Sequence, residues 1–313
     1  MENIRIVVVC GPTASGKTAL AVQIAEEFGG EVISADSMQV YKGMDIATAK
    51  PTEQETRGIP HHLISFVDPE TAFSVADYVA LAHKKIKDVH DRGRLPIIAG
   101  GTGLYISSLI NNVKFDDTGA DYKFREEMRN YAEAYGNKAL LEKLRYIDPK
   151  TADKLHENNL SRIIRAIEVH KISGKKISEQ QAISKLETSP YKPIMIGLNF
   201  LTRELLYERI EKRVEIMLNK GLLNEAESFL RRDRLPTCAQ AIGYKELKPY
   251  FDRVSSLDEC VENLKRSTRQ YAKRQLTWFR REGRILWVSN DNTESDIKNF
   301  EKSKKIIKNC GNY

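Results

Sequence analysis

The stretch from residue 4 to residue 28 constrains the fold of this chain more than any other. Ile4–Cys10 is an unbroken apolar run, typical of a buried parallel strand, and residues 19–28 have the Ala- and Leu-rich composition of a helix. Between them lies a glycine-rich loop of the form G-x-x-x-x-G-K-T, residues 11–18. A strand, such a loop and a helix in this order predict an α/β fold with a P-loop core, in which helices flank a parallel sheet.

The residues of this loop predict a site for several phosphate oxygens. Gly11 and Gly16 allow backbone N–H groups to turn inward, the following helix points its positive end at the same place, and Lys17 adds a mobile charge. In such loops a threonine hydroxyl helps to hold Mg²⁺ between two phosphates, so Thr18 is the candidate metal-binding residue. The loop does not distinguish a nucleoside triphosphate from a diphosphate ester. We expect these residues to bind the phosphates: Gly11, Pro12, Thr13, Ala14, Ser15, Gly16, Lys17 and Thr18.

Length and composition indicate a globular protein of the cytoplasm. The 313 residues suffice for one large α/β core and a smaller appendage, and no apolar run reaches the length of about 20 residues that spans a membrane. The first strand begins too early to leave room for a signal peptide. Four cysteines without metal-ligand spacing favour reduced thiols. We expect a monomer without a membrane partner, and the net charge of +7 is a weak pointer to nucleic acid.

The texture of the chain changes near residue 114. Residues 116–181 are highly charged and helical in period, and a strand-like run returns at residues 192–200. We therefore expect a helical insertion at 114–191 in a core formed by 1–113 and 192–313. In the insertion, Arg162 and Arg165 share one helical face, where pairing with Glu168 is the alternative to a role in binding.

Two further predicted strands end in polar residues. Residues 31–36 end in Asp36, and residues 97–99 lead into a glycine-rich turn that carries Thr102. Because the carboxyl ends of parallel strands open onto one crevice, both side chains should lie beside the P-loop. Asp36 is either a catalytic carboxylate or the cap of a turn or an indirect Mg²⁺ ligand, and the glycines equally suit tight helix packing.

Other segments carry simpler signals. The run at 63–67, after two adjacent histidines with a structural role, predicts a strand. Residues 74–90 predict a helix capped by Ser74 and Asp77, and residues 203–230 are again helical.

The most basic segment, residues 264–281, predicts a helix with one cationic face. Arg266, Arg269, Lys273 and Arg280 recur at helical spacing, and a separate apolar stripe would hold the helix to the core. An ordinary solvated face is the alternative. The excess of cations over carboxylates along the segment favours a polyanionic partner.

Several motifs together resemble those of the tRNA dimethylallyltransferases, also called tRNA isopentenyltransferases. Beside GPTASGKT they are DSMQVYKGMD at 36–45, TAKP at 48–51, GGTGLY at 100–105, RIIRAIE at 162–168, GY at 243–244 and KRQLTWFR at 273–280. They follow the family's order over most of the chain. Ala47 stands where the family usually has Gly, and Glu157 where many members have Pro. The C-terminal zinc finger of some eukaryotic members is absent, which indicates a bacterial type.

The resemblance implies a reaction. In the family, a dimethylallyl group moves from dimethylallyl diphosphate to N6 of the adenosine on the 3′ side of the tRNA anticodon, with release of diphosphate. Lys17 and Mg²⁺ would neutralise the leaving group, Asp36 would be the general base, and Thr102 would line the channel between the substrates. The implied tRNA contacts are Asp36, Ser37, Met38, Gln39, Thr102, Ser161, Arg162, Ile163, Ile164, Arg165, Gln240, Gly243, Tyr244, Lys245, Lys273, Arg274 and Arg280.

Three other functions share parts of this pattern. A P-loop kinase would have the same loop, together with an acceptor pocket and an arginine lid that the sequence does not identify. A prenyltransferase acting on free AMP would need neither the helical insertion nor the basic helix. An RNA-binding module would keep tRNA binding without any turnover.

Overall fold

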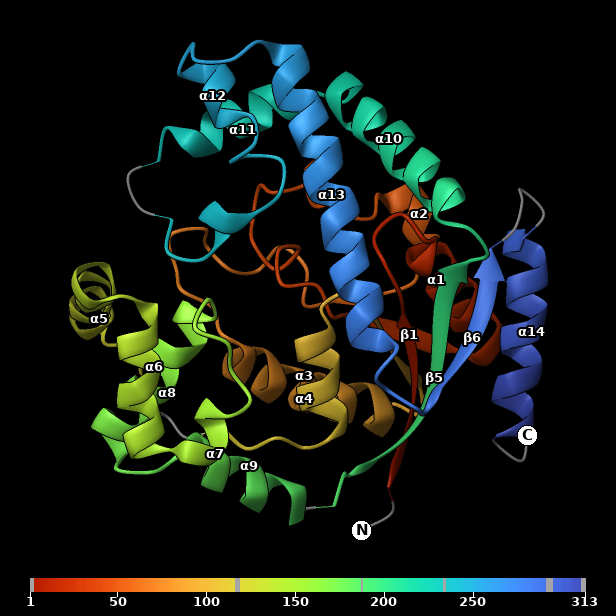
Figure 1. The fold of residues 1–313 in the computed structure, drawn as a ribbon. Coiled ribbons are helices and arrows are strands. Elements are labelled where there is room, and N and C mark those ends of the chain that lie inside the picture. The colour runs from red at the N-terminus through yellow and green to blue at the C-terminus, as the bar shows by residue number, and fades with distance from the viewer. Residues whose placement is uncertain (1–2, 116–118, 187, 233–234, 291–294, 311–313) are drawn as a thin grey trace. The chain divides into compact units, whose positions relative to one another are not determined.

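The computed structural model describes residues 3–115, 119–186, 188–232, 235–290 and 295–310, and the chain divides into two compact units (Figure 1). One unit consists of Met1–Ile110 and Pro190–Tyr313, and the other of Asn111–Ser189. The sequence-based expectation placed the insertion at 114–191. The expected end of the insertion is too late, because Tyr191 already begins a strand of the larger unit.

The larger unit is built on a six-stranded sheet in the order β3-β2-β4-β1-β5-β6, with every neighbouring pair parallel. The predicted α/β fold with a parallel sheet is therefore confirmed. Strand β1 lies at the centre, where Cys10 is aligned with Gly100 of one neighbour and Gly197 of the other. The strands are β1 (Ile4–Cys10), β2 (Gly30–Ser34), β3 (His61–His62), β4 (Leu95–Gly100), β5 (Tyr191–Phe200) and β6 (Ile285–Asn290).

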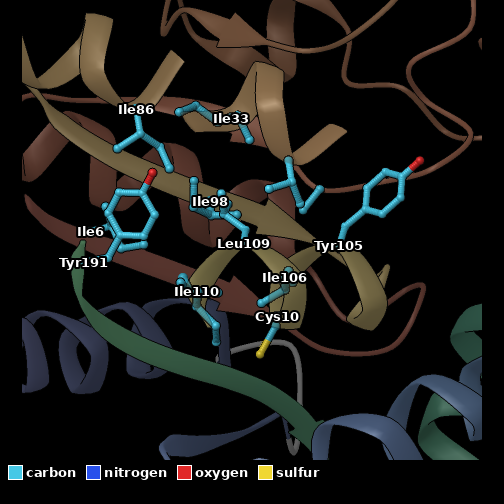
Figure 2. Packing of buried hydrophobic residues seen from close by; sticks show 14 of the residues in the cluster. Ile6, Cys10, Ile33, Ile86, Ile98, Tyr105, Ile106, Leu109, Ile110 and Tyr191 are labelled. Carbon is cyan, nitrogen blue, oxygen red and sulfur yellow. The ribbon is translucent and has the colours of Figure 1, made fainter. Parts of the chain in front are cut away.

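Helices cover both faces of this sheet, which explains why its strands are apolar on both sides. Figure 2 shows one face, where Ile6, Ile33 and Ile98 of three strands pack against Leu109 and Ile110. Helices α3 (Val75–Asp91) and α4 (Gly103–Ile110) cover this face, and α1 (Lys17–Phe28) and α14 (Ser295–Asn309) cover the other. Each large side chain removed from water in this way stabilises the fold by about 1.5–3 kcal/mol.

The helices of the larger unit begin and end largely where local signals predict. Helix α3 starts after Ser74, whose hydroxyl accepts from the Asp77 N–H while the Asp77 carboxylate accepts from Ser74 N–H. The expected helical segment 203–230 is two helices, because Gly221 between them has a φ of 95°. The helices are α1 (Lys17–Phe28), α2 (Glu53–Thr56), α3 (Val75–Asp91), α4 (Gly103–Ile110), α10 (Arg203–Asn219), α11 (Leu222–Leu230), the 3₁₀-helix η1 (Cys238–Gln240), α12 (Lys248–Phe251), α13 (Leu257–Phe279) and α14 (Ser295–Asn309).

The prediction of a strand at 63–67 is wrong. Strand β3 ends at His62, because Leu63 and Ser65 take left-handed conformations with φ of 60° and 54°. The chain then turns so that Val67 forms an isolated parallel bridge with Tyr41. Leu63 and Val67 of this run pack into the core without adding to the sheet, whereas Phe66 is exposed.

A second apolar cluster lies beyond the sheet and shapes the functional region. It joins the loop that follows β2 to helices α10, α11 and α13, with Met44, Met217, Phe229 and Leu264 among its buried members. Helix α13 runs alongside α10 (Figure 1), and Ala272 of α13 packs with Ile210 of α10. These segments lie far apart in the sequence.

The smaller unit is helical, with its own apolar core. Its helices are α5 (Tyr122–Tyr135), α6 (Asn137–Ile147), α7 (Pro149–Ala152), α8 (Leu160–Ser173) and α9 (Ile177–Leu186). A fully buried carboxylate, Glu168, accepts hydrogen bonds from Arg125 and Arg165 at 2.6–2.9 Å. Burial alone would raise the pKa of Glu168, but the hydrogen bonds from the two arginines hold this pKa below its usual range.

Two further expectations concern the state of the cysteines and the presence of membrane-spanning helices. All four cysteines are free thiols, and burial raises the pKa of Cys10 to about 12. Among the described residues, no helix has both the length and the apolar character that crossing a bilayer demands.

Candidate active site

Three loops meet where the central strands end. The P-loop follows β1, Asp36 follows β2 and the Gly100–Gly103 turn follows β4, and the order β2-β4-β1 makes these strands neighbours. Thr102 ties two of the loops together, since its N–H donates to Ala35 O at 3.1 Å and its Oγ1 accepts from Ser37 N–H at 3.0 Å. The predicted juxtaposition of Asp36 and Thr102 with the P-loop is present in the structure.

The glycines of the β4 turn are needed for close packing. A Cβ on Gly100 would lie 2.2 Å from Ala35 O, and a Cβ on Gly101 would lie 2.1 Å from Nε2 of Gln275 in α13. The interpretation of this turn as tight packing therefore holds, because it fits closely against Ala35 and α13, whereas the role of Thr102 in the site stays a prediction.

The P-loop holds its lysine against its own backbone. Gly16 adopts a φ of 87° directly before α1, and Lys17 Nζ donates to Pro12 O at 2.6 Å. The pKa of Lys17 is lowered to about 8, chiefly because burial removes the ammonium group from water and also because of the positive charge of Arg213. This lysine is therefore poised to gain from an anion placed beside it.

A polar cavity of about 80 Å³ lies at the P-loop. Lys17 and Thr18 line it from α1, Asp36 from the end of β2, and Arg213 from α10. Two cations thus face one carboxylate among the described lining residues. The surplus positive charge suits a ligand with two or more negative charges.

A larger cavity of about 220 Å³ adjoins the polar one. The two share Thr13, Asp36, Thr48, Arg213 and Tyr271, so these residues lie on the boundary between them. The far wall is apolar, with Ile210, Val214, Met217, Leu222 and Leu264 supplied by α10, α11 and α13. One end of the site is built for charge and the other for an uncharged group.

Asp36 has two roles in the geometry. Its Oδ1 accepts hydrogen bonds from the N–H groups of Met38 at 2.9 Å and Gln39 at 3.2 Å, which is the turn cap that the sequence offered as an alternative. The same carboxylate lines both cavities. Capping fixes its orientation while leaving it in contact with the cavity.

Arg213 and Tyr271 are site residues that the sequence analysis did not single out. Arg213 falls on the apolar stripe of α10, three residues after Ile210 and four before Met217, and a charged residue in such a stripe is the signal that was available. Tyr271 lines both cavities, and burial raises the pKa of Tyr271 well above its usual range.

Residues expected to contact tRNA fall into two groups in the larger unit. Ser37, Met38, Gln240, Gly243, Lys245 and Arg274 line the larger cavity together with Asp36, and Gln39 lines the polar one. Tyr244 is the exception, because its side chain is only 2% exposed, stacks on Phe229 and donates to Glu225 Oε1. The structure places Tyr244 in the core and not on an RNA-facing surface, which corrects that expectation for its side chain.

Helix α13 presents the predicted cations on the side away from its buried residues. Arg266, Lys273 and Arg280 are exposed. Arg269 differs, since its Nη1 lies 2.6 Å from Glu211 Oε1 of α10. The sequence-based argument compared these cations only with carboxylates of the same segment. It therefore missed this pair, whose carboxylate lies on another helix.

The five candidate tRNA-contacting residues of the helical unit differ in their exposure. Ser161 and Arg162 are exposed, whereas the side chains of Ile163 and Ile164 are 0% and 3% exposed in the core of the unit. Those two isoleucines therefore stabilise α8, and the expectation that their side chains contact tRNA is corrected. Arg165 pairs with Glu168, which was the alternative interpretation.

The family follows from comparison of the whole chain with known proteins. A family model described as IPP transferase matches residues 39–282. The chain belongs to the IPP transferase family. The resemblance found from the motifs is thereby confirmed.

Members of the IPP transferase family are similar over nearly the full length. The chain is 50% identical over 307 residues to the tRNA dimethylallyltransferase of Thermoanaerobacter sp. (strain X514), covering 97% of this chain and 96% of that protein. It is 46% identical over 298 residues to the protein of that name from Halalkalibacterium halodurans, with 95% of each covered.

Solved structures agree with this assignment. A full-length tRNA isopentenylpyrophosphate transferase from Bacillus halodurans matches with a TM-score of 0.73 and 44% identity, over 98% of this chain and 96% of that one. A eukaryotic dimethylallyltransferase acting on tRNA matches with a TM-score of 0.84 and 31% identity, over 98% of this chain and 79% of that one.

Proposed function

We propose that the protein transfers a dimethylallyl group from dimethylallyl diphosphate to N6 of the adenosine on the 3′ side of the tRNA anticodon, releasing diphosphate. The observation that carries this proposal is the meeting of Lys17 and Arg213 at one end of a cavity whose other end is apolar. Relatives named tRNA dimethylallyltransferase and a structural neighbour that acts on tRNA support the choice of substrates. We place the enzyme in the cytoplasm as a monomer.

The polar cavity is the proposed diphosphate site. The backbone N–H groups of the later P-loop residues are the proposed donors to the diphosphate, and Lys17 and Arg213 supply positive charge. As the bond between C1 and the bridging oxygen breaks, negative charge grows on the diphosphate. These groups stabilise that charge without moving, which lowers the barrier.

The oxygen donors of this cavity fit a magnesium ion. Thr18 and Asp36 both line it, while among the described residues no cluster of three or more His, Cys, Asp or Glu side chains is arranged to hold a metal. A cation that takes most of its ligands from substrate oxygens and water suits such a sparse set. Mg²⁺ held by Thr18 would neutralise part of the charge on the leaving diphosphate.

Asp36 is the proposed general base. The lone pair of adenine N6 is delocalised into the ring, and attack on C1 of the prenyl group makes the N6 protons acidic. Asp36 lies on the boundary between the two cavities, where it can take one of these protons as the N6–C1 bond forms. Thr102 accepts a hydrogen bond from the Ser37 N–H, next to Asp36 in the chain, and is the proposed channel residue.

The larger cavity is the proposed entrance for the adenosine. Its lining includes the exposed residues Gln240, Lys245 and Arg274, which can contact the nucleotides that flank the target. Lys273 of α13, Arg280 directly after this helix, and Ser161 and Arg162 of the helical unit are the proposed contacts to the rest of the tRNA. An unpaired base of the anticodon loop leaves its stack at low cost.

A single transfer assay tests this function. Labelled dimethylallyl diphosphate and Mg²⁺ are offered with unmodified tRNA that carries the target adenosine, with free AMP, or with ATP in place of the prenyl donor. Label in tRNA alone is the expected result. Label in AMP alone indicates a prenyltransferase of free nucleotides, and transfer from ATP without prenyl transfer indicates a kinase.

A further inference from the structure

Gln275 of α13 links two of the loops that form the site. Its Oε1 accepts a hydrogen bond from the Thr13 N–H of the P-loop at 2.8 Å, and its Nε2 donates to Gly101 O of the β4 turn at 2.9 Å. The side chain is 5% exposed and lines the polar cavity. A primary amide carries its acceptor oxygen and its donor nitrogen on separate atoms, and of the two residues with this group, asparagine is shorter than glutamine by one methylene.

A neighbour of Gln275 on the same helical face contacts the same turn. Trp278, one turn later, packs so closely that a Cβ on Gly103 would lie 2.2 Å from its ring. Two successive turns of α13 therefore rest on Gly101–Gly103. The opposite face of this helix exposes Lys273 and other cations.

The bond to Thr13 also affects which groups face the diphosphate. A P-loop binds anions through its backbone N–H groups, and the Thr13 N–H is already satisfied by Gln275. The donors left for an anion are those of the later loop residues, next to Lys17. The position of α13 thereby fixes where in the loop a diphosphate can sit.

We propose that Gln275 is a positioning residue for prenyl transfer, which holds the P-loop and the β4 turn at a set distance through α13. This inference rests on the proposed function, since the distance it sets is that between the leaving diphosphate and the Asp36–Thr102 pair. A displacement of about 1 Å between reacting groups can reduce a rate by about 100-fold. Gln275 itself touches neither reacting atom in this scheme.

The experiment replaces the amide by an apolar chain of the same length. Gln275→Met removes both hydrogen bonds, and Gln270→Met, at an exposed position of the same helix, is the matched control. We expect Gln275→Met to lower kcat by about 10- to 100-fold while KM for both substrates stays within about threefold, because the bound groups are present but misaligned. Wild-type kcat in Gln275→Met, or a loss confined to KM, overturns the proposal.

A second variant, Gly101→Ala, tests the contact between Gln275 and the β4 turn from the side of the turn. The added methyl group of Gly101→Ala would displace the Gln275 amide, so the double variant should lose no more kcat than the worse single variant. If the kcat losses of the two single variants multiply in the double variant, the two residues act separately and the proposed link between the loops is overturned. Gly101→Ala also serves alone if Gln275→Met does not fold.

Hydrogen exchange tests the link between the loops without any catalysis. Residues 11–18 and 100–103 should exchange at least tenfold faster in Gln275→Met than in the wild type or in Gln270→Met. Unchanged exchange in both segments overturns the proposal that Gln275 links the two loops, even if activity falls. If the wild type transfers no label to tRNA, the proposed function fails by itself, and the exchange result still decides whether Gln275 connects the two loops.

Discussion

The Tyr244 hydroxyl donates a 2.9 Å hydrogen bond to Glu225 Oε1 and so joins α11 to the segment before α12. The same carboxylate accepts from the backbone N–H groups of Asp45 and Ile46 at 2.8 Å and of Ala47 at 2.9 Å. Glu225 therefore holds the loop that leads to Thr48, a residue that lines both cavities.

We expect Glu225→Ala to lower the free energy of unfolding by about 2 kcal/mol, because several N–H groups and one hydroxyl lose a charged acceptor. The melting temperature should fall by about 4 °C in thermal denaturation. Glu227→Ala, which breaks the surface pair with Arg231 on the same helix, is the control and should leave the melting temperature unchanged. Equal melting of the two variants would contradict the role of Glu225.

Asp36→Asn separates the two roles of this carboxylate. The amide oxygen can still accept from the Met38 and Gln39 N–H groups, but the side chain can no longer take a proton. Turnover should fall by about 100-fold or more, with tRNA affinity changed only a few-fold. Asp36→Ala should also loosen the turn. Near-normal turnover in Asp36→Asn would remove Asp36 from the role of base.

The affinity for dimethylallyl diphosphate should decrease above pH 8. Lys17 has a pKa of about 8, and a bound anion restores this pKa toward its ordinary value, so binding takes up a proton above pH 8. The affinity should then fall by about tenfold for each pH unit, whereas below pH 8 the lysine is charged and the dependence should vanish. Calorimetric titration measures this, and Lys17→Met should abolish the dependence.

Arg213→Gln should change both the affinity and its pH dependence. Loss of the guanidinium should weaken diphosphate binding at pH 7 by about 10- to 100-fold. Because the charge of Arg213 lowers the pKa of Lys17, its removal should also move the midpoint of the pH dependence above 8. Lys212→Gln, at an exposed position of the same helix, should change neither. A midpoint that stays at 8 would show that the two cations do not interact.

The exposed cations of α13 should determine the salt dependence of tRNA binding. Lys273→Ala should reduce the slope of log affinity against log salt by about 1, with no effect on diphosphate affinity. Arg269→Ala should reduce it less, because Arg269 is engaged by Glu211. Lys87→Ala on α3 is the control. An unchanged slope in Lys273→Ala would exclude this face from tRNA binding.

Local sequence signals predicted the parts of the site that are contiguous in the chain. The P-loop, Asp36 and the turn with Thr102 each follow an apolar strand, and a parallel sheet must bring such ends together. Arg213 and Gln275 lie far along the chain from the loops that they face, since Gln275 is 262 residues from Thr13 and 174 from Gly101. Periodicity along the chain does not predict which distant loop such a helical residue will contact.

Errors arose where tertiary structure overrides composition. The run at 63–67 is apolar and β-branched, yet two left-handed residues prevent a strand. The motif residues Ile163, Ile164 and Tyr244 were assigned to tRNA contact through the resemblance, but their side chains are core residues. A shared motif does not say which of its members support the fold and which meet a ligand.

The central position of β1 has a consequence for synthesis of the protein. The P-loop strand emerges from the ribosome well before its partner β5, which begins only at Tyr191. One edge of β1 must therefore remain unpaired, or be covered by other parts of the chain, until β5 has been made. The cavities also need α13, which ends at Phe279, so neither cavity is complete in the nascent chain before this helix has been made.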